Sequence, residues 1–373
     1  MVHRKAGLGS YARELATHLV AGDPGNTYSL FHYDRNPPAA LPEPLNRLAL
    51  RTVALSARPW RLSVAARHLA GLPMDATFPD VDLFHATEHL LPPLRRIRTV
   101  FTFHDAIYAL FPQFHLPMNR LFLGLMMPRF LRRASAVVTI SECSKRDAVR
   151  LYGLDPDRLQ VIYEGVDPRF QPNAGPDRRL RLRQTYALPE QYVLYVGTIE
   201  PRKNLVALLD AYAALLQSPT PGLQSCGLVI VGRKGWLYQG FFQRLKQLGL
   251  EGRVILPGYV ADEDLPVLYS AADLFAFPSL YEGFGLPVLE AMACGTPVVC
   301  ADASSLPEIA GDAALLVPPT DVKALAGAME RLISDAELRR ELRGRGLVQA
   351  SRFTWERTAT QTLGVYERAM RGA

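Results

Sequence analysis

Residues 273–297 read DLFAFPSLYEGFGLPVLEAMACGTP and join an apolar run, a glycine-containing loop and a second apolar segment. The run Leu274–Phe277 predicts a buried strand, which Pro278 ends. The following segment predicts a helix that opens with Pro287, because proline suits the first helical turn. Gly295 is expected to end that helix in the left-handed conformation that glycine adopts easily. The stretch therefore predicts a strand–loop–helix unit of an α/β fold.

The loop of this unit has the features of a nucleotide-sugar site. The amides of Phe284, Gly285 and Leu286 are expected at the helix N-terminus, where backbone donors and the helix dipole favour a phosphate. Glu282 precedes the helix and Glu290 lies within it, so one carboxylate can accept sugar hydroxyls and the other a ribose diol. We therefore expect these residues to bind a nucleotide sugar.

Two glutamates eight positions apart around FGLP resemble the donor site of retaining GT-B glycosyltransferases of family 4, also called glycosyl transferases group 1. GTIEPRKN at Gly197–Asn204 resembles the second donor segment of that family. TFHD at Thr102–Asp105 and GLGSYARELA at residues 7–16 fit its N-terminal domain. The resemblance covers nearly the whole chain. It implies two Rossmann-like domains facing a central cleft, with the last helix crossing back to the first domain.

Apolar runs alternate with helical segments along the chain, which is typical of parallel α/β sheets. The Pro- and Gly-containing segment Asp167–Arg179 predicts an interdomain linker. We therefore expect an acceptor-side domain at residues 1–170, a donor domain at residues 177–352, and a C-terminal helix at residues 353–373 that packs on the first domain. Predicted strands lie at Leu83–Phe84, Val100–Phe103, Ala136–Ile140, Gln160–Tyr163, Tyr192–Val196, Leu228–Val231, Val254–Leu256, Leu274–Phe277, Val298–Ala301 and Ala314–Val317.

One element of the family is out of place at the start of the chain. Only MVHRKA precedes Gly7, where relatives have their first strand. Either the start is truncated, or the innermost strand of the first sheet is missing or replaced.

A histidine and two cations complete the expected catalytic set. His104 follows the strand Val100–Phe103, and ligands of doubly wound sheets bind at the carboxyl ends of strands. Arg202 and Lys203 follow another strand and can neutralise a leaving nucleoside diphosphate. By resemblance, His104 touches the transferred sugar, and His104, Arg202, Lys203 and Glu282 are catalytic. His85, at the end of a neighbouring strand, is a weaker candidate for the acceptor side.

The same resemblance assigns a larger set of residues to the donor. Gly7 and Gly9 lie in a turn that opens a helix, Gly232 follows a strand, and Tyr259 lies in a segment expected to meet the nucleobase. The expected donor-binding residues are Gly7, Gly9, Gly232, Tyr259, Phe284, Gly285, Leu286 and Glu290.

No cofactor and no metal are expected. Three Asp-x-Asp triplets, at Asp80, Asp155 and Asp262, each precede an apolar element, where aspartate commonly caps or turns the chain. A dinucleotide fingerprint would need a third glycine where Ala12 stands, which disfavours a nicotinamide oxidoreductase. No pair of carboxylates at glycosidase spacing is identifiable, so a hydrolase has no support.

Charge and cysteine content bear on partners and location. The chain has a net charge of +6, and all of this excess lies in residues 1–176. The clusters Arg95, Arg96, Arg98 and Arg129, Arg132, Arg133 make an anionic membrane surface a candidate partner. No nucleic-acid module accompanies them. Four cysteines without metal-ligand spacing, and no apolar run of about 18 residues, indicate a cytoplasmic protein with reduced thiols that can sit at the inner face of the membrane.

The expected donor follows from the resemblance alone. The motifs are most like those of mannosyltransferases of polysaccharide and lipid-glycan assembly, so GDP-mannose is favoured. UDP-glucose and UDP-N-acetylglucosamine remain alternatives, and so does a non-catalytic sugar-nucleotide-binding subunit. The expected acceptor is a saccharide or a lipid-linked saccharide.

Overall fold

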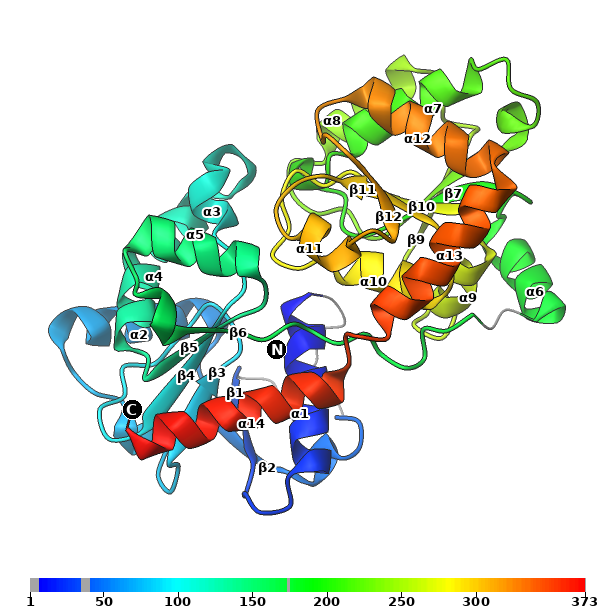
Figure 1. Ribbon diagram of the computed structural model, residues 1–373. Helices are drawn as coiled ribbons and strands as arrows, with labels where there is room; N and C mark the ends of the chain where they lie inside the picture. The colour runs from blue at the N-terminus through cyan, green and yellow to red at the C-terminus, as the bar shows by residue number, and fades with distance from the viewer. Residues whose placement is uncertain (1–6, 35–40, 173–174, 373) are drawn as a thin grey trace. The chain divides into compact units, whose positions relative to one another are not determined.

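The structure is a computed structural model that describes residues 7–34, 41–172 and 175–372 (Figure 1). The chain divides into two compact units, Met1–Gly165 together with Thr354–Ala373, and Val166–Phe353. Each unit is built on a parallel sheet with helices on its faces. The predicted α/β architecture of two Rossmann-like units is confirmed.

The first unit contains a four-stranded parallel sheet in the order β3-β4-β5-β6. The strands of this sheet are β3 (Leu83–Ala86), β4 (Arg98–Phe103), β5 (Ala136–Thr139) and β6 (Leu159–Val161). The larger helices of the unit are α1 (Leu8–Gly22), α2 (Ala57–Ala70), α4 (Pro117–Arg133), α5 (Glu142–Tyr152) and α14 (Trp355–Arg371). Helix α3 (Ile107–Leu110) is a single short turn. Alternate residues of β4 face opposite sides, as a strand requires. Phe101 packs with α2 and α4, whereas Val100 packs with α14.

The second unit contains a six-stranded parallel sheet in the order β12-β11-β10-β7-β8-β9. Its strands are β7 (Tyr192–Val196), β8 (Gly227–Val231), β9 (Val254–Gly258), β10 (Leu274–Phe277), β11 (Val298–Ala301) and β12 (Ala314–Val317). Its helices are α6 (Pro176–Tyr186), α7 (Leu205–Leu216), α8 (Gln239–Gln247), α9 (Leu265–Ala271), α10 (Leu286–Ala293), α11 (Leu306–Ala310), α12 (Val322–Ser334) and α13 (Ala336–Ala350). Helices α7 and α12 pack together on one side, and α10 and α13 on the other. The strand order reverses between β7 and β10, and ligands of such sheets bind at this point.

The last helix belongs to the first unit, as the sequence predicts. Helix α14 packs along α1 (Figure 1) and contributes Val365 and Ala369 to the core beneath Val100. Thr354 caps α14, its Oγ1 accepting a hydrogen bond from the amide of Arg357 at 3.2 Å. A Cβ on Gly165 would lie 2.2 Å from the nitrogen of Trp355, so only glycine fits where the chain passes this helix start.

Three details differ from the sequence-based expectations. Strands β1 (Ser29–Tyr33) and β2 (Ala49–Val53) were not expected, because both are short, largely exposed or half-buried, and lack a clean alternating pattern. The predicted linker is too long, since Pro176 and Asp177 begin helix α6 inside it. Helix α10 begins at Leu286, one residue before Pro287.

The question of the first strand falls on residues 1–6, which lie outside the described residues. Within the described parts, β1 and β2 form a separate parallel pair. Phe31 of β1 contacts Phe84 of β3, with ring centroids 6.0 Å apart. The pair therefore joins the core of the first unit through side chains.

All four cysteines are buried and free of disulfides, as expected. Across the described part of the chain, no helix combines the length and the apolar character that crossing a membrane requires.

A buried chain of hydrogen bonds joins four elements of the first unit. The Tyr11 hydroxyl lies 3.1 Å from Thr102 Oγ1, and His85 places Nε2 2.7 Å from the same oxygen. His85 Nδ1 lies 2.7 Å from the Tyr366 hydroxyl of α14. Both ring nitrogens of His85 are therefore engaged inside the protein, so the expectation that His85 serves the acceptor is replaced by a structural role.

The buried hydrogen bonds of His85 predict a specific pH dependence of the free energy of unfolding. Burial lowers the pKa of His85 from 6.5 to about 3. Between these values the unfolded chain takes up a proton that the folded chain does not. The free energy of unfolding should therefore fall with falling pH, by at most about 1.4 kcal/mol per pH unit for this one group. Urea unfolding at several pH values measures the slope, which His85→Gln should reduce.

Tyr366→Phe is the matched control for that experiment. It removes one hydrogen bond but keeps the buried histidine, so it should lower stability by about 1 kcal/mol while leaving the pH slope intact. Equal slopes for His85→Gln and the unsubstituted protein would contradict the assignment.

Candidate functional site

The site of the second unit lies where the strand order of its sheet reverses. Strands β7 and β10 are adjacent and parallel, with Leu274 opposite Val193 and Phe275 opposite Leu194. Their carboxyl ends therefore meet at one edge of the sheet. The loop 197–204 follows β7 and the loop 278–285 follows β10. Two segments about 80 residues apart in sequence thus lie together at this edge.

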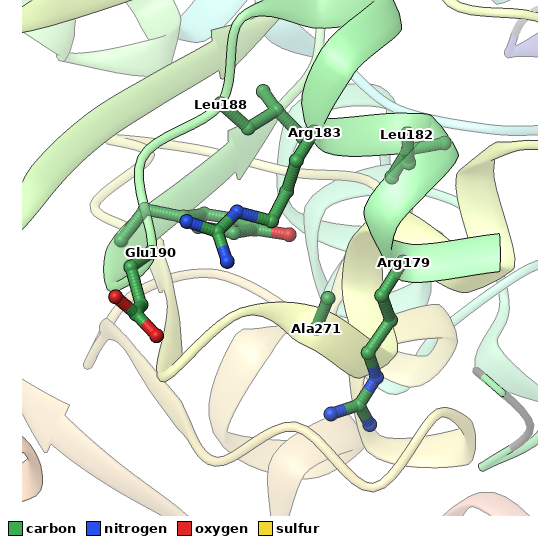
Figure 2. A pocket seen from close by; sticks show the side chains of 7 residues that line it. Arg179, Leu182, Arg183, Leu188, Glu190 and Ala271 are labelled. Carbon is green, nitrogen blue, oxygen red and sulfur yellow. The ribbon is translucent and has the colours of Figure 1, made fainter. Parts of the chain in front are cut away.

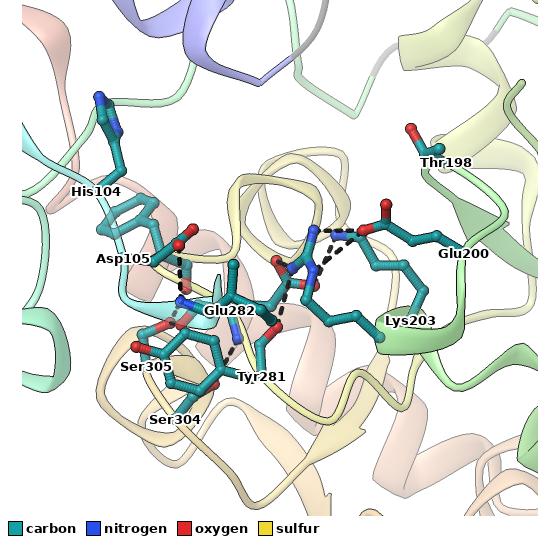
Figure 3. Close-up of polar contacts among 12 residues, drawn as sticks. His104, Asp105, Thr198, Glu200, Lys203, Tyr281, Glu282, Ser304 and Ser305 are labelled. Atoms are coloured by element: carbon teal, nitrogen blue, oxygen red, sulfur yellow. Dashed lines mark hydrogen bonds and ion pairs between the residues drawn. The ribbon is translucent and has the colours of Figure 1, made fainter. Parts of the chain in front are cut away.

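Four charged side chains make the centre of this site (Figure 3). Glu282 accepts a hydrogen bond from Lys203 Nζ at its Oε1 and from Arg202 at its Oε2, both at 2.6 Å. Glu200 Oε1 accepts from Arg202 Nε at 3.0 Å and from its second terminal nitrogen at 2.7 Å. Lys203, Glu200 and Glu282 are all buried. We call these four residues the charge cluster; it contains two cations and two carboxylates.

Main-chain contacts hold the charge cluster in place. The carbonyl oxygen of Arg202 accepts a hydrogen bond from the amide of Leu280 at 2.9 Å, which ties the two loops together. The side chain of Asn204 donates to the carbonyls of Pro278, at 3.1 Å, and Pro319, at 2.7 Å. Asn204 has φ 57°, a left-handed conformation that asparagine tolerates. The loop geometry therefore depends on bonds between distant parts of the sequence.

Two serines after β11 support Glu282 from its other side (Figure 3). Ser304 Oγ accepts from the amide of Glu282 at 2.9 Å. Ser305 Oγ donates to the carbonyls of Glu282, at 3.0 Å, and Phe284, at 2.5 Å. The loop after β10 is thereby held to a third strand end.

The charges of the cluster shift its pKa values. Burial alone would raise the pKa of Glu282, but the charges of Arg202 and Lys203 outweigh it and bring the pKa down to about 2. Burial, and then the charge of Arg202, lower the pKa of Lys203, while Glu282 opposes this shift. Glu282 is therefore an anion across the neutral pH range and is paired with the two cations, and its catalytic role toward the sugar stays a prediction.

Glu290 has a different environment from Glu282. It lies in α10 and accepts a hydrogen bond from the hydroxyl of Tyr269, in α9, at 2.8 Å. Burial raises the pKa of Glu290 to about 7, and the bond from Tyr269 partly opposes that shift. The two glutamates of the motif thus have pKa values near 2 and 7, on either side of their usual value.

Two glycines of the expected donor site have steric reasons to be glycine. Gly285 caps α10 at φ 121°, and a Cβ there would lie 2.8 Å from Leu306. A Cβ on Gly232 would lie 2.0 Å from the carbonyl oxygen of Gly197, so the ends of β7 and β8 could not pack together. Gly295 ends α10 at φ 72°, as predicted. The glycines are required by packing, whatever their role toward a ligand.

Tyr259 remains accessible, with 66% of its surface exposed. Its hydroxyl lies 3.3 Å from Asp262, one of the Asp-x-Asp residues. Phe284 and Leu286 lie on either side of Gly285 at the start of α10. The structure therefore brings these donor-binding candidates to one strand edge of the second unit.

His104, Gly7 and Gly9 belong to the first unit and form a separate group. Gly7 caps α1 with φ 56°, and Gly9 is buried in its first turn. Tyr11 of the same helix meets the His104 ring edge-on, with centroids 4.8 Å apart. His104 Nε2 lies 3.0 Å from the carbonyl oxygen of Thr87, which can only accept. Nε2 therefore carries the proton, and Nδ1 is the acceptor.

Burial, followed by the neighbouring His89, lowers the pKa of His104 to about 3. The ring is therefore neutral at pH 7. Asp105 accepts from the amide of Ile107 at 3.1 Å, so it holds the turn after β4. A role of His104 toward the sugar stays a prediction.

Sequence reasoning missed Glu200 and Tyr269 as members of the site. Glu200 stands in the motif itself, two residues before Arg202 and three before Lys203, and this spacing from two cations was the available signal, whereas its burial is seen only in the structure. Tyr269 carried no local signal, because only the packing of α9 against α10 brings it to Glu290.

A hollow at the opposite end of β7 is distinct from this site (Figure 2). It is lined by Arg179, Leu182, Arg183, Leu188, Glu190, Tyr192 and Ala271. Tyr192 is the first residue of β7, whereas the charge cluster follows its last residue. The hollow is therefore not the donor site.

Aspartates of two Asp-x-Asp triplets make hydrogen bonds within the protein. Asp155 accepts from the amide of Asp157 and caps a turn, and Asp264 accepts from the Tyr186 hydroxyl at 3.0 Å. In the ranges that the structure describes, no group of three His, Cys, Asp or Glu side chains could hold a metal ion. A reaction without metal or cofactor stays a prediction.

Comparison with known proteins places the chain in a family. The family model described as Glycosyltransferase Family 4 matches residues 6–170, and the family model described as Glycosyl transferases group 1 matches residues 179–347. The chain is 39% identical over 287 residues to O-antigen chain mannosyltransferase B of Escherichia coli, covering 76% of this chain and 74% of that protein. The chain belongs to glycosyltransferase family 4 and is a glycosyltransferase of glycan biosynthesis.

Solved structures agree on the fold. Sucrose-phosphate synthase from Thermosynechococcus elongatus matches with a TM-score of 0.77 and 25% identity, over 99% of this chain and 94% of that one. The Anabaena protein HepE, solved with UDP and glucose, matches with a TM-score of 0.68 and 24% identity over 87% of each chain. The GT-B fold inferred from the motifs is confirmed.

The contact between Tyr269 and Glu290 predicts a pH-dependent step in nucleotide binding. If Glu290 accepts ribose hydroxyls, it must be ionised, so the affinity for a nucleoside diphosphate should rise as pH increases through about 7. Tyr269→Phe removes the bond that lowers this pKa, so the rise should move to higher pH. Titration calorimetry across the pH range measures both effects.

Tyr212→Phe is the control, because it also removes one buried tyrosine hydrogen bond of the same unit, donated to the carbonyl of Cys226 and away from Glu290. A pH profile that Tyr269→Phe leaves in place would show that Glu290 does not act as the titrating group.

Proposed function

We propose that this glycosyltransferase moves a hexose, with mannose from GDP-mannose favoured, to a saccharide or lipid-linked saccharide with retention of anomeric configuration. The observation that carries the proposal is the charge cluster at the strand reversal of the second unit. The 39% identity to an O-antigen chain mannosyltransferase supports mannose as the sugar.

The cluster supplies what departure of a nucleoside diphosphate needs. Negative charge grows on the leaving diphosphate as the glycosidic bond breaks, and fixed cations in a buried site stabilise it. Lys203 has three N–H donors, so it can hold Glu282 and a diphosphate oxygen together. The guanidinium group of Arg202 is hydrogen-bonded to both Glu200 and Glu282, so its side chain loses little conformational entropy when a substrate binds. The cations are therefore held in position before the substrate arrives.

The remaining groups are assigned by the chemistry of the ligand. Glu290 would accept hydrogen bonds from the two ribose hydroxyls. The backbone amides of Phe284, Gly285 and Leu286 at the helix start would donate hydrogen bonds to phosphate oxygens. His104, neutral and with Nδ1 as an acceptor, would orient a sugar hydroxyl. In a retaining transfer the acceptor hydroxyl attacks the anomeric carbon on the same face of the sugar from which the leaving group departs. A phosphate oxygen of the leaving group takes the proton of that hydroxyl.

The donor base is tested by a binding panel. GDP should bind with higher affinity than UDP, and GDP-mannose should raise the melting temperature more than UDP-glucose or UDP-N-acetylglucosamine. Calorimetry with the two free nucleotides is the direct measurement. Tight UDP binding without GDP binding would contradict the mannose assignment and favour a UDP-sugar enzyme.

The two cations are tested through turnover. Lys203→Ala combined with Arg202→Ala should reduce kcat by the equivalent of roughly 2–4 kcal/mol, because the charge that they stabilise develops in the transition state. Glu290→Ala should instead weaken nucleotide binding, since ribose contacts are similar in both states.

Lys323→Ala, an exposed lysine of α12, is the control for loss of positive charge and should leave kcat unchanged. Melting temperatures separate a lost charge from a lost fold. A protein that binds the donor but never releases the sugar, with or without these substitutions, would be a non-catalytic binding subunit.

A further inference from the structure

We propose that the outer face of helices α2 and α4 in the first unit docks the protein on an anionic phospholipid membrane. The inference goes beyond the transfer reaction and holds whichever nucleotide the donor carries. It rests on exposed apolar side chains and on a one-sided charge, both located on these two helices.

Helix α4 presents an apolar stripe to solvent. Met118, Leu121 and Leu125 are 80%, 68% and 44% exposed, and they follow one another at spacings of three and four residues. Residues at these spacings lie on one face of a helix. Burying such side chains in the protein would be favourable, so three of them together on a solvent face need an explanation.

Helix α2 presents a second stripe of the same kind. Leu62 and Leu69 are 67% and 56% exposed, and lie seven residues apart on the same face. The opposite face of α2 carries Trp60 and Val64, which are buried against the sheet. The exposed leucines are therefore additional to a complete buried face.

The two helices lie side by side. Arg61 of α2 donates to Asn119 Oδ1 of α4 at 2.7 Å and stacks over the Phe122 ring at 4.1 Å. His68 meets Phe130 further along, with ring centroids 5.2 Å apart. Contacts that advance together along both helices show that they run in the same direction. Their outward stripes therefore belong to one surface.

Charge on this surface has a single sign. Helix α2 contains Arg58, Arg61 and Arg67, helix α4 contains Arg120, Arg129, Arg132 and Arg133, and neither contains an aspartate or glutamate. Arg129 and Arg132 continue the apolar stripe of α4 at the next helical spacings. Arg95 donates to the carbonyl of Gly71 at 2.7 Å and so adds a cation at the end of α2.

The structure refines the membrane expectation drawn from sequence. Of the apolar residues just before the second arginine cluster, Leu121 and Leu125 face solvent, whereas Met126 is fully buried and Phe122 packs beneath Arg61. The first arginine cluster is divided. Arg95 lies at the end of α2, whereas Arg98 begins β4 and lies by Gly372, after α14.

A bilayer surface is the partner whose chemistry matches both features. Arginines attract anionic headgroups, and apolar side chains of an interfacial helix enter the boundary between headgroups and acyl chains. A nucleic acid would use the cations but would leave the leucine and methionine side chains in water. Charge complementarity together with the apolar stripes therefore favours an anionic membrane.

The experiment is co-sedimentation of the full chain with vesicles. Vesicles of phosphatidylcholine alone are compared with vesicles that also contain phosphatidylglycerol, across a salt series. Binding should require the anionic lipid and weaken as salt rises. The variant Arg129→Gln with Arg132→Gln should weaken binding by about tenfold or more. The variant Met118→Ser with Leu121→Ser should retain only weak binding that depends strongly on salt.

The matched control lies on helix α6 of the second unit. Arg178 and Arg181 are exposed there, so Arg178→Gln with Arg181→Gln removes two positive charges, as the α4 arginine variant does. This control should bind vesicles like the unsubstituted protein. Equal loss in the α4 and α6 variants would overturn the proposal, because net charge alone would then drive binding.

Two further outcomes would also overturn it. One is absence of binding to anionic vesicles at low salt. The other is a dimer, seen by light scattering, that the α4 substitutions dissociate, which would make the face a contact between copies of the chain. Nucleotide binding by calorimetry should be unchanged in the α4 variants, since their residues lie in the first unit. A failed donor assignment therefore leaves this test intact.

Discussion

The ion pairs of Glu282 with Arg202 and Lys203 are the interaction on which the candidate site of the second unit depends. They join the loop after β7 to the loop after β10. These loops meet because β7 and β10 are adjacent parallel strands, at the point where the sheet reverses its strand order. Ser304 and Ser305, after β11, and Asn204 add bonds that fix the same loops. Architecture and electrostatics therefore converge on one edge of one sheet.

Burial strengthens the electrostatic interactions of the charge cluster and raises the cost of losing any one of its members. A buried carboxylate that lost either cation would keep an uncompensated charge, which is far costlier than losing an exposed ion pair. The four members therefore depend on one another. The same burial places the cations in surroundings of low polarity, where their attraction for a diphosphate is stronger than in water. The arrangement that stabilises the loops is thus the one that can stabilise a leaving group.

The first unit uses the two faces of its sheet in different ways. Helix α14 covers one face, where Val365 and Ala369 complete a core and Tyr366 binds His85. Helices α2 and α4 cover the other face with buried aromatic and methionine side chains, while their outer sides carry leucines, methionine and arginines. The outward residues are additional to those that pack in the two cores. This separation leaves that surface available for contact with another phase.

The amino-acid sequence by itself determined the elements and most of the candidate site. Runs such as Leu274–Phe277 are apolar at every position because a central parallel strand is buried on both sides, and Pro278, Gly285 and Gly295 mark the loop and helix ends through their backbone preferences. The tertiary structure alone decided that Tyr269 serves Glu290, that His85 is structural, and that Leu121 faces solvent while Met126 does not. The reason is physical: local patterns report backbone preference and burial tendency, whereas the partner of a side chain depends on which elements pack against it.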